Sequence, residues 1–206
     1  MVFPLSQPDF TLRKVAEADF PSRFGKFRIF GFEGVRTIGT EEAIALKIGD
    51  LAPEKGPTLV RIHSQCLTGD VFHSLRCDCR SQLELALDQI VKEQRGLLIY
   101  EHQEGRGIGL INKLRAYELQ DKGMDTVEAN VELGFEADLR DYALPAAIIQ
   151  YLGIVQVRLL SNNPEKVAAL ENAGIEVVER APIIAPPVET TMEYLRTKRE
   201  KMGHLF

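Results

Sequence analysis

The sequence predicts an α/β fold, with a mixed β-sheet core and flanking helices, in a single domain over residues 1–206. The first observation behind this prediction is a strand–helix–strand unit. Residues 58–63 and 97–100 are apolar runs typical of buried strands. Between them, apolar residues recur at positions i, i+3, i+4, i+7 and i+8 over residues 83–91, which indicates an amphipathic helix.

The second observation is a similar unit in the C-terminal half. Strands are expected at residues 155–160 and 175–178, with a helix between them at residues 165–173. Pro164 suits the first position of that helix, and Gly174 suits its end. Two such units in one chain are typical of α/β proteins.

The N-terminal part of the chain predicts antiparallel strands. Residues 11–16 and 26–32 have strand character, and residues 21–25 between them contain turn-forming residues, so a hairpin is expected. Residues 42–48 are expected to form a third strand, followed by a loop at residues 53–57.

The remaining segments are expected to be helices and two terminal arms. The predicted helices are at residues 108–122, 125–133 and 142–152, and a capping box at residues 190–193 predicts a last helix to about residue 202. The expected arms and linker are a short N-terminal arm at residues 1–10, a proline-rich linker at residues 181–187 and a C-terminal helix arm at residues 188–206.

Composition limits the classes of function. The chain has 206 residues and is 45% hydrophobic, which is enough to bury a core. Its net charge of -5 argues against a general nucleic-acid-binding surface but allows a local pocket for an anionic ligand. No apolar run approaches 18 residues, and the N-terminus lacks the basic and apolar regions of a signal peptide. We therefore expect a cytoplasmic protein with neither a membrane nor a nucleic-acid partner.

All three cysteines fall within one short stretch, at Cys66, Cys77 and Cys79. A shared zinc ion explains this grouping better than three independent core positions, and an odd number of thiols argues against a disulfide framework. Three protein ligands leave one coordination position for water, whose pKa zinc lowers to about 7, so the spacing favours a catalytic metal. Two alternatives stay open: a structural site that His63 or His73 closes, and buried thiols without a metal.

A glycine-rich segment follows the second strand of the first unit. Gly105, Gly107 and Gly109 alternate with other residues, which lets backbone amides approach an anion closely. Arg106 beside these amides suits a phosphate, and the carboxylate of Glu104 suits a guanine edge or a metal. The alternative is a glycine-rich turn without a ligand.

Three further features allow a functional or a structural interpretation. Ser161, Asn162 and Lys166 surround a helix N-terminus, which suits a phosphate, or they only cap the helix. Residues 134–141 bring three carboxylates and an arginine into one loop, which from composition alone indicates a solvated surface. Tyr117, a lone tyrosine on a predicted helix, indicates packing.

Several segments match motifs of one family. They are residues 61–70 (RIHSQCLTGD), the Cys77-Asp78-Cys79 pair, residues 103–110 (QEGRGIGL), 112–117 (NKLRAY), 125–130 (DTVEAN), 162–164 (NNP) and 201–205 (KMGHL). Together, and in this order, they resemble the GTP cyclohydrolase II family from about Arg13 to the C-terminus. Such an ordered series is far more specific than any single motif.

The resemblance implies a zinc-dependent hydrolase that acts on GTP. The implied reaction opens the imidazole ring, releases C8 as formate and removes pyrophosphate. Its product is 2,5-diamino-6-(5-phosphoribosylamino)pyrimidin-4(3H)-one, and the reaction is the first committed step of riboflavin biosynthesis. The resemblance also implies Mg²⁺ on the triphosphate and a homodimer.

By the same resemblance, individual residues acquire expected roles. The metal and catalytic positions are Cys66, Cys77 and Cys79 as zinc ligands, Asp138 as proton acceptor, Arg140 as proposed nucleophile toward the α-phosphorus and Tyr117 near the ring chemistry. The substrate-binding positions are Arg61, Ile62, His63, Ser64, Gln65, Gln82, Glu104, Gly105, Arg106, Thr126, Ser161 and Lys166. Because arginine stays protonated in proteins, Arg140 would first have to lose a proton, for which Asp138 is the candidate acceptor. Electrostatic stabilisation is the alternative role for Arg140.

The chain departs from the commonest family pattern at five positions. They are Gln65 for glutamate, His73 for a small residue, Arg80 for glycine, His102 for arginine and Ser161 for threonine. Arg80 is a long cation beside the thiols, where it could alter the pocket or bind phosphate itself. Two other functions fit the sequence: a paralogue that only opens the ring or acts on another purine nucleotide, and a non-catalytic, zinc-stapled nucleotide-sensing protein. Tyr117 argues against the first, and Asp138, Arg140 and Tyr117 argue against the second.

Overall fold

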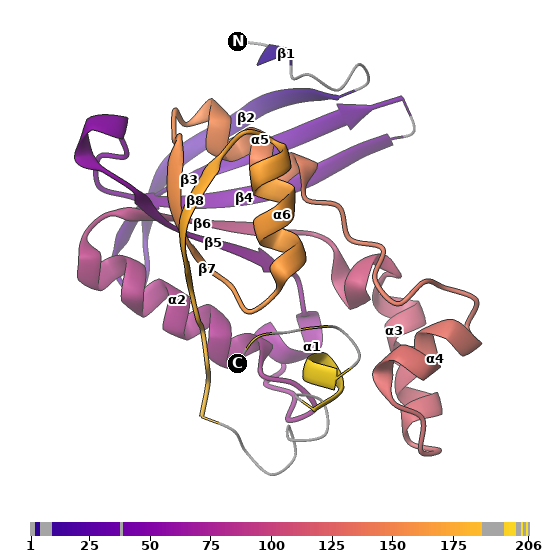
Figure 1. Ribbon diagram of the computed structural model, residues 1–206. Coiled ribbons are helices and arrows are strands. Elements are labelled where there is room, and N and C mark those ends of the chain that lie inside the picture. The colour runs from indigo at the N-terminus through magenta and orange to yellow at the C-terminus, as the bar shows by residue number, and fades with distance from the viewer. Residues whose placement is uncertain are drawn as a thin grey trace.

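A mixed β-sheet forms the centre of the protein in the computed structural model (Figure 1). The structure describes residues 3–4, 10–37, 39–186, 196–200, 203 and 205. Within these residues, eight strands lie side by side in the order β1 (Phe3–Pro4), β2 (Thr11–Pro21), β3 (Lys26–Arg36), β4 (Gly39–Ile48), β6 (Gly96–Glu101), β5 (Thr58–Ser64), β7 (Gln156–Leu160) and β8 (Glu176–Ala181). The strands from β1 to β6 in this order pair antiparallel, and those from β6 to β8 pair in parallel.

Helices cover both faces of the sheet (Figure 1). They are α1 (Leu67–Asp70), α2 (Cys79–Glu93), α3 (Leu110–Gln120), α4 (Thr126–Glu132), α5 (Ala143–Tyr151) and α6 (Pro164–Asn172), with 3-10 turns η1 (Pro53–Lys55) and η2 (Glu104–Gly107). On one face, Ile90 of α2 and Leu98 of β6 share a buried cluster. On the other face, Ile148 of α5 and Ile99 of β6 share a second cluster. Neighbouring residues of β6 point to opposite faces, and both faces are covered, so this central strand is apolar from Leu97 to Ile99.

Both strand–helix–strand units predicted from the sequence are confirmed. β5 and β6 pair in parallel and are joined through α2, and β7 and β8 pair in parallel and are joined through α6. The predicted N-terminal hairpin is also present, since β2 and β3 are antiparallel with Phe20 opposite Phe27. Its strands are longer than expected, because pairing continues through polar positions that the apolar pattern does not mark.

The ends of the chain differ in how much the structure describes. Phe3 lies opposite Leu12 of β2, so part of the segment expected as an N-terminal arm pairs with the sheet. Residues 196–200 are helical. The predicted capping box at residues 190–193 lies outside the described residues.

The parallel strands end together at one edge of the sheet. In β5 and β6, Ser64 lies opposite Glu101 at this edge, and β7 ends there at Leu160. α3 and α4 stand beyond the same edge, away from both covered faces (Figure 1). Open α/β sheets bind ligands at the carboxyl ends of their parallel strands, so this edge is where a site is expected.

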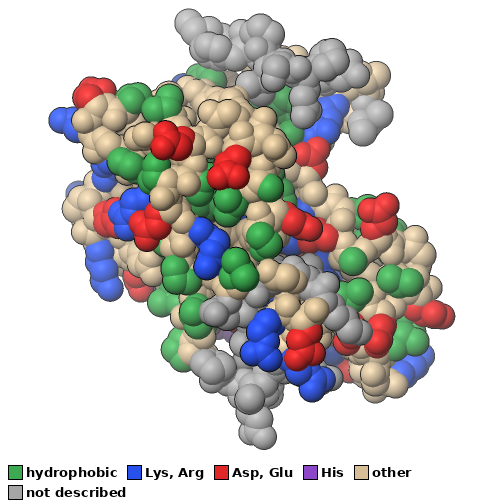
Figure 2. All heavy atoms as spheres, in the orientation of Figure 1, with side chains coloured by type: hydrophobic (Ala, Val, Ile, Leu, Met, Phe, Trp, Pro, Cys, Tyr) green, Lys and Arg blue, Asp and Glu red, His purple; other side chains and the backbone are tan. Residues whose placement is uncertain are grey.

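A membrane-spanning helix and a basic patch are the two surface features typical of a membrane partner and a nucleic-acid partner. No helix in the described part of the chain is both long and apolar enough to cross a membrane. On the face that Figure 2 shows, acidic and basic side chains are interspersed. Several lysine and arginine side chains also line the cavity described below.

We expect Ile90→Ala to lower the free energy of unfolding by about 2–5 kcal/mol, because it empties a fully buried position between α2 and the sheet. Urea unfolding followed by circular dichroism measures this change. Val155→Ala is the control: that side chain is 55% exposed, so its effect should stay within about 0.5 kcal/mol. Similar effects for the two variants would contradict the central place of α2 in the core.

Candidate active site

A cavity opens at the carboxyl ends of β5, β6 and β7 and extends to α3 and α4. It encloses about 1080 Å³ of empty space, part of it open to solvent. The predicted site residues that line it are Arg61, His63, Ser64, Gln65, Cys66, Cys77, Cys79, Gln82, Glu104, Gly105, Arg106, Tyr117, Thr126, Arg140, Ser161 and Lys166. Two predicted residues do not line it. The Ile62 side chain is buried in the core, and the Asp138 carboxylate binds the Arg140 guanidinium.

The three thiols come from both ends of the connection between β5 and α2. Cys66 lies just past β5, whereas Cys77 and Cys79 lie at the start of α2. All three sulfurs lie within 4.8 Å of one another, and Cys66 Sγ is 3.6 Å from Cys77 Sγ. Among the described residues, this is the one group of three or more His, Cys, Asp or Glu side chains close enough to share a metal ion. It contains no histidine. The alternative in which His63 or His73 closes a four-ligand site is therefore not supported.

The surroundings of the thiols fit a bound metal. Gly69 faces them so closely that a Cβ atom there would lie 2.9 Å from Cys77 Sγ and 3.1 Å from Cys66 Sγ. Hydrogen bonds from the other two thiols, and then the Lys113 ammonium 3.2 Å away, hold the pKa of Cys66 well below its ordinary value. The hydrogen bond with Cys66 raises the pKa of Cys77 to about 11. Of the three thiols, Cys66 alone has a lowered pKa, since hydrogen bonds to the other thiols raise the pKa of Cys79 as well. The fit to zinc therefore rests on three sulfur donors that face one point.

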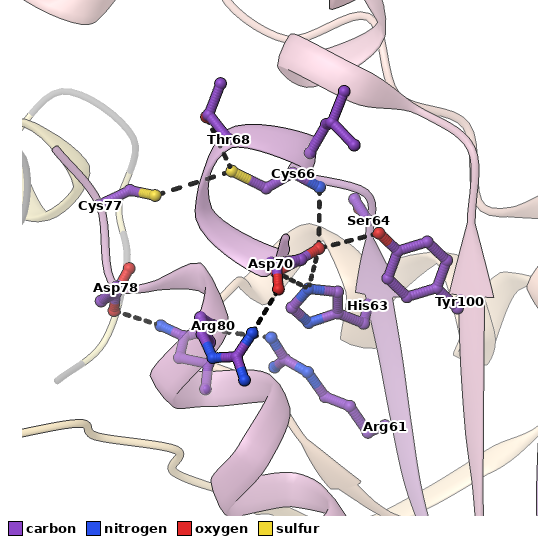
Figure 3. A network of polar contacts seen from close by, with 12 residues as sticks. Arg61, His63, Ser64, Cys66, Thr68, Asp70, Cys77, Asp78, Arg80 and Tyr100 are labelled. Carbon is purple, nitrogen blue, oxygen red and sulfur yellow. Dashed lines mark hydrogen bonds and ion pairs between the residues drawn. The ribbon is translucent and has the colours of Figure 1, made fainter. Parts of the chain in front are cut away.

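Asp70 ties the thiol loop to the sheet (Figure 3). Its carboxylate accepts hydrogen bonds from the Tyr100 hydroxyl at 2.9 Å and the Cys66 backbone N–H at 3.0 Å, and it lies 3.2 Å from His63 Nε2. Tyr100 and His63 belong to neighbouring strands, and their rings stack with centroids 5.5 Å apart. Burial lowers the pKa of His63, so we assign a neutral ring that donates from Nε2 to Asp70.

Glu104 is held by the protein itself. Its carboxylate accepts hydrogen bonds from Lys113 Nζ at 2.6 Å and from the backbone N–H groups of Leu67 at 2.6 Å and Gly105 at 3.0 Å. By its residue type this carboxylate suits a guanine edge or a metal. In the structure it holds Lys113 beside Cys66 and also lines the cavity.

Arg106 lines the cavity from a strained turn. Arg106 and Gly105 both have φ of 61°, and a residue other than glycine in this left-handed region costs about 1–3 kcal/mol. The Leu139 backbone N–H donates to the Arg106 carbonyl at 3.0 Å, which holds the turn against the loop of Arg140. Both terminal nitrogens of Arg106 are buried without a hydrogen-bond partner within the described residues. Such a guanidinium suits an anionic ligand.

Asp138 and Arg140 form an ion pair at the cavity wall. Arg140 Nε donates to Asp138 Oδ1 at 2.8 Å, and the two side chains are only 11% and 12% exposed. The expectation of a solvated surface, drawn from composition alone, is therefore wrong for these two residues. Although burial opposes it, the hydrogen bond to Asp138 holds the pKa of Arg140 above its ordinary value.

The N-terminus of α6 combines capping with cavity lining. Asn163 caps the helix by accepting from the Glu165 backbone N–H at 3.0 Å, and Ser161 Oγ accepts from the Asn163 N–H at 3.1 Å. Lys166 Nζ donates to the Ile62 carbonyl at 2.9 Å, and burial lowers the pKa of this lysine. Ser161 and Lys166 line the cavity as well. The capping interpretation is therefore confirmed for this segment, and its binding of a phosphate stays a prediction.

Arg80 does not line the cavity. Its NH1 donates to the Asp70 carbonyl at 2.6 Å, and its NH2 lies 2.8 Å from Glu84 Oε1. It therefore joins α1 to α2, and its position does not support the expectation that it binds phosphate. His73 and His102, two other departures from the family pattern, are exposed.

The model of the GTP cyclohydrolase II family matches residues 13–182. The chain belongs to the GTP cyclohydrolase II family. It is 55% identical to a GTP cyclohydrolase-2 of Proteus mirabilis, over 94% of this chain and 96% of that protein. It is 53% identical to a GTP cyclohydrolase-2 of Haemophilus influenzae, over 94% of this chain and 88% of that protein. It is also 53% identical to the riboflavin biosynthesis protein RibBA of Chlorobium phaeovibrioides, over 94% of this chain and 47% of that protein.

One solved structure has partial similarity to this chain. It is RibBX, a two-domain 3,4-dihydroxy-2-butanone 4-phosphate synthase from A. baumannii, with a TM-score of 0.47 and 16% identity over 88% of this chain and 42% of that chain. No conclusion about function rests on it. The family match over most of the chain makes this protein a GTP cyclohydrolase II enzyme.

Several residues around the site of this GTP cyclohydrolase II received no role from the sequence. Asp70 is one helical turn past Cys66, a spacing from which its bond to the Cys66 N–H could have been predicted. Lys113 and Lys198 had no such local signal, because their partners Cys66 and Asp78 lie 47 and 120 residues away.

We expect Gly69→Ala to lower the zinc content of the purified enzyme several-fold, because its methyl group would push Cys66 and Cys77 apart. Elemental analysis measures zinc per chain. Gly31→Ala is the matched control, since the nearest atom to its added Cβ is a Val15 methyl at 3.3 Å. Full zinc content in Gly69→Ala would mean that the metal lies elsewhere or that the loop can open.

Proposed function

We propose that this protein opens the imidazole ring of GTP, releases C8 as formate and removes pyrophosphate, the first committed step of riboflavin biosynthesis. The observation that carries the proposal is that three facing thiols and a group of cationic side chains line one cavity. Ring opening and deformylation need hydrolytic attack on carbon. Loss of pyrophosphate needs charge neutralisation around phosphates. The thiols and the cations suit these two demands respectively.

The cations of the cavity support binding of a triphosphate. The lysine and arginine residues that line it are Arg61, Arg76, Arg106, Lys113, Arg140, Lys166 and Lys198. Four of these side chains pair with carboxylates: Arg76 with Asp121, Lys113 with Glu104, Arg140 with Asp138 and Lys198 with Asp78. The cations still outnumber these carboxylates, in a chain of net charge -5. The unpaired Arg106 guanidinium is the strongest candidate for a phosphate contact. We infer that GTP binds as its Mg²⁺ complex, since the metal offsets phosphate charge.

We assign Cys66, Cys77 and Cys79 as zinc ligands. When bound there, zinc would act as a Lewis acid and lower the pKa of a bound water, which makes that water available for hydrolysis at neutral pH. The Lys113 ammonium, 3.2 Å from Cys66 Sγ, offsets the negative charge of three thiolates. Burial raises the pKa of Tyr117, so its hydroxyl stays protonated and can donate a hydrogen bond to the purine ring as it opens.

We infer that Arg140 stabilises charge at the α-phosphoryl group and does not attack phosphorus. Asp138 keeps the guanidinium protonated, and a protonated guanidinium has no lone pair for attack. Arg140 NH1 lies 3.4 Å from Ser64 Oγ, and Ser64 is the last residue of β5. The Arg140 guanidinium therefore faces the carboxyl ends of the parallel strands. Substrate contacts of the other predicted residues, the homodimer and the cytoplasmic location stay predictions.

The deciding experiment incubates metal-analysed protein with GTP and Mg²⁺ and quantifies formate, pyrophosphate and the pyrimidine product separately. We expect all three, with about one zinc per chain, as for a single three-cysteine site. Cys66→Ser should lose zinc and formate production together, because it removes one of three metal ligands.

Other outcomes would identify other functions. A ring-opened product without formate would indicate the paralogue that stops at the formamide. Tight GTP binding without turnover would indicate the nucleotide-sensing protein. Full formate production by a Cys66→Ser protein that keeps its zinc would contradict the metal assignment.

Arg140→Ala should slow pyrophosphate release by about 100-fold, the usual loss when one electrostatic donor is removed from an active site. Arg140→Lys keeps the positive charge but loses the forked geometry of the guanidinium. Its rate of pyrophosphate release should lie between those of Arg140→Ala and the unchanged protein. Arg115→Ala is the control, because Arg115 is exposed and does not line the cavity. Unchanged pyrophosphate release in Arg140→Ala would remove this residue from the site.

A further inference from the structure

The last described helical residues contact the loop that carries two of the three cysteines. Lys198 Nζ donates a hydrogen bond to Asp78 Oδ1 at 3.0 Å, across 120 residues of sequence. Asp78 lies between Cys77 and Cys79, and the Lys198 and Asp78 side chains are only 10% and 7% exposed. Figure 1 shows this C-terminal turn, in yellow, at the loop that precedes α2. Lys198 also lines the cavity.

Asp78 connects this contact to the far side of the cavity. Its second carboxylate oxygen accepts a hydrogen bond from Gln82 Nε2 at 2.5 Å, and Gln82 Oε1 accepts one from Arg61 at 2.8 Å. Arg61 also donates to the Leu160 carbonyl at the end of β7, at 2.9 Å. A continuous line of hydrogen bonds therefore runs from Lys198, through the cysteine loop, to the parallel strands.

The positive charge of Lys198 compensates a buried negative charge. The Asp78 side chain is only 7% exposed, and each of its carboxylate oxygens accepts a hydrogen bond, one from Lys198 and one from Gln82. Without Lys198, the charged carboxylate would stay buried between two cysteines that become thiolates when they bind a metal. Removal of one partner of such a buried pair is strongly unfavourable.

One side of the C-terminal turn makes this contact. Thr197 and Lys198 are buried, with 6% and 8% of the whole residue exposed. Their neighbours Arg196, Arg199 and Glu200 are exposed. This difference in exposure indicates that the turn docks on the cysteine loop through Thr197 and Lys198. The exposed neighbour Arg199 provides a matched control residue.

We propose that Lys198 is a positioning residue, which holds the Cys77–Cys79 loop and, through Gln82, the Arg61 side chain in the geometry that zinc retention and turnover require. The effect on turnover rests on the proposed function. The effect on zinc retention depends only on the three cysteines as metal ligands.

The test compares zinc-loaded Lys198→Met, Lys198→Arg and Arg199→Met in the full chain. We expect Lys198→Met to lose zinc to a chelator about tenfold faster and to lower kcat for formate about tenfold, as for other residues that support metal ligands, with a smaller change in KM for GTP. Lys198→Arg keeps the charge and should keep most of both properties. Arg199→Met changes a side chain that is 65% exposed and should match the unchanged protein.

A double variant separates the ion pair from a general loss of structure. If the unpaired Asp78 charge causes the defect, Asp78→Asn combined with Lys198→Met should regain part of the zinc retention that Lys198→Met loses. Additive losses in the double variant would overturn the proposal, as would zinc release and kcat in Lys198→Met equal to those of the unchanged protein.

The zinc-release measurement needs no GTP. A protein that binds zinc but releases no formate would therefore refute the proposed function while Lys198 is still tested. A protein that holds no zinc would overturn both.

Discussion

The carboxylate of Asp70 is the contact on which the geometry of this site depends. It joins His63 on β5, Tyr100 on β6 and the backbone of Cys66 at one buried point. Hydrogen bonds to a charged group are each worth about 1.5–3 kcal/mol, and a buried carboxylate without them is costly. The loop of Cys66 therefore cannot shift independently of the strand ends. Metal sites depend on such supporting contacts to orient their ligands.

The same principle extends around the cavity, where other charged side chains are held by hydrogen bonds within the protein. Glu104 holds Lys113, the Ile62 carbonyl holds Lys166, and Asp138 holds Arg140. Charges held in this way are ready to act without reorganisation, which is the main source of electrostatic stabilisation in enzymes. Arg106 differs, since its terminal nitrogens have no partner in the described part of the chain. It is the group with the most to gain from an anionic ligand.

Much of the fold and of the site was predictable, for reasons that differ by element. The spacing of apolar residues from Leu83 to Val91 predicted α2, because burial of one helix face imposes that period. The grouping of the cysteines predicted their proximity. The burial of Asp138 and Arg140 was not predictable from composition, because the loop is polar and only its packing against η2 turns these side chains inward.

The sequence by itself determined the family, the two parallel strand units and the metal-ligand candidates, because motif order, apolar periodicity and cysteine spacing are local properties of the chain. Only the tertiary structure decided that Arg80 turns to Asp70, away from the cavity, and that Lys198 meets Asp78. Arg80 and Glu84 are one helical turn apart on α2, which is a local spacing. The contacts of Arg80 with Asp70 and of Lys198 with Asp78 instead join different segments, whose positions depend on the packing of the whole sheet and its helices.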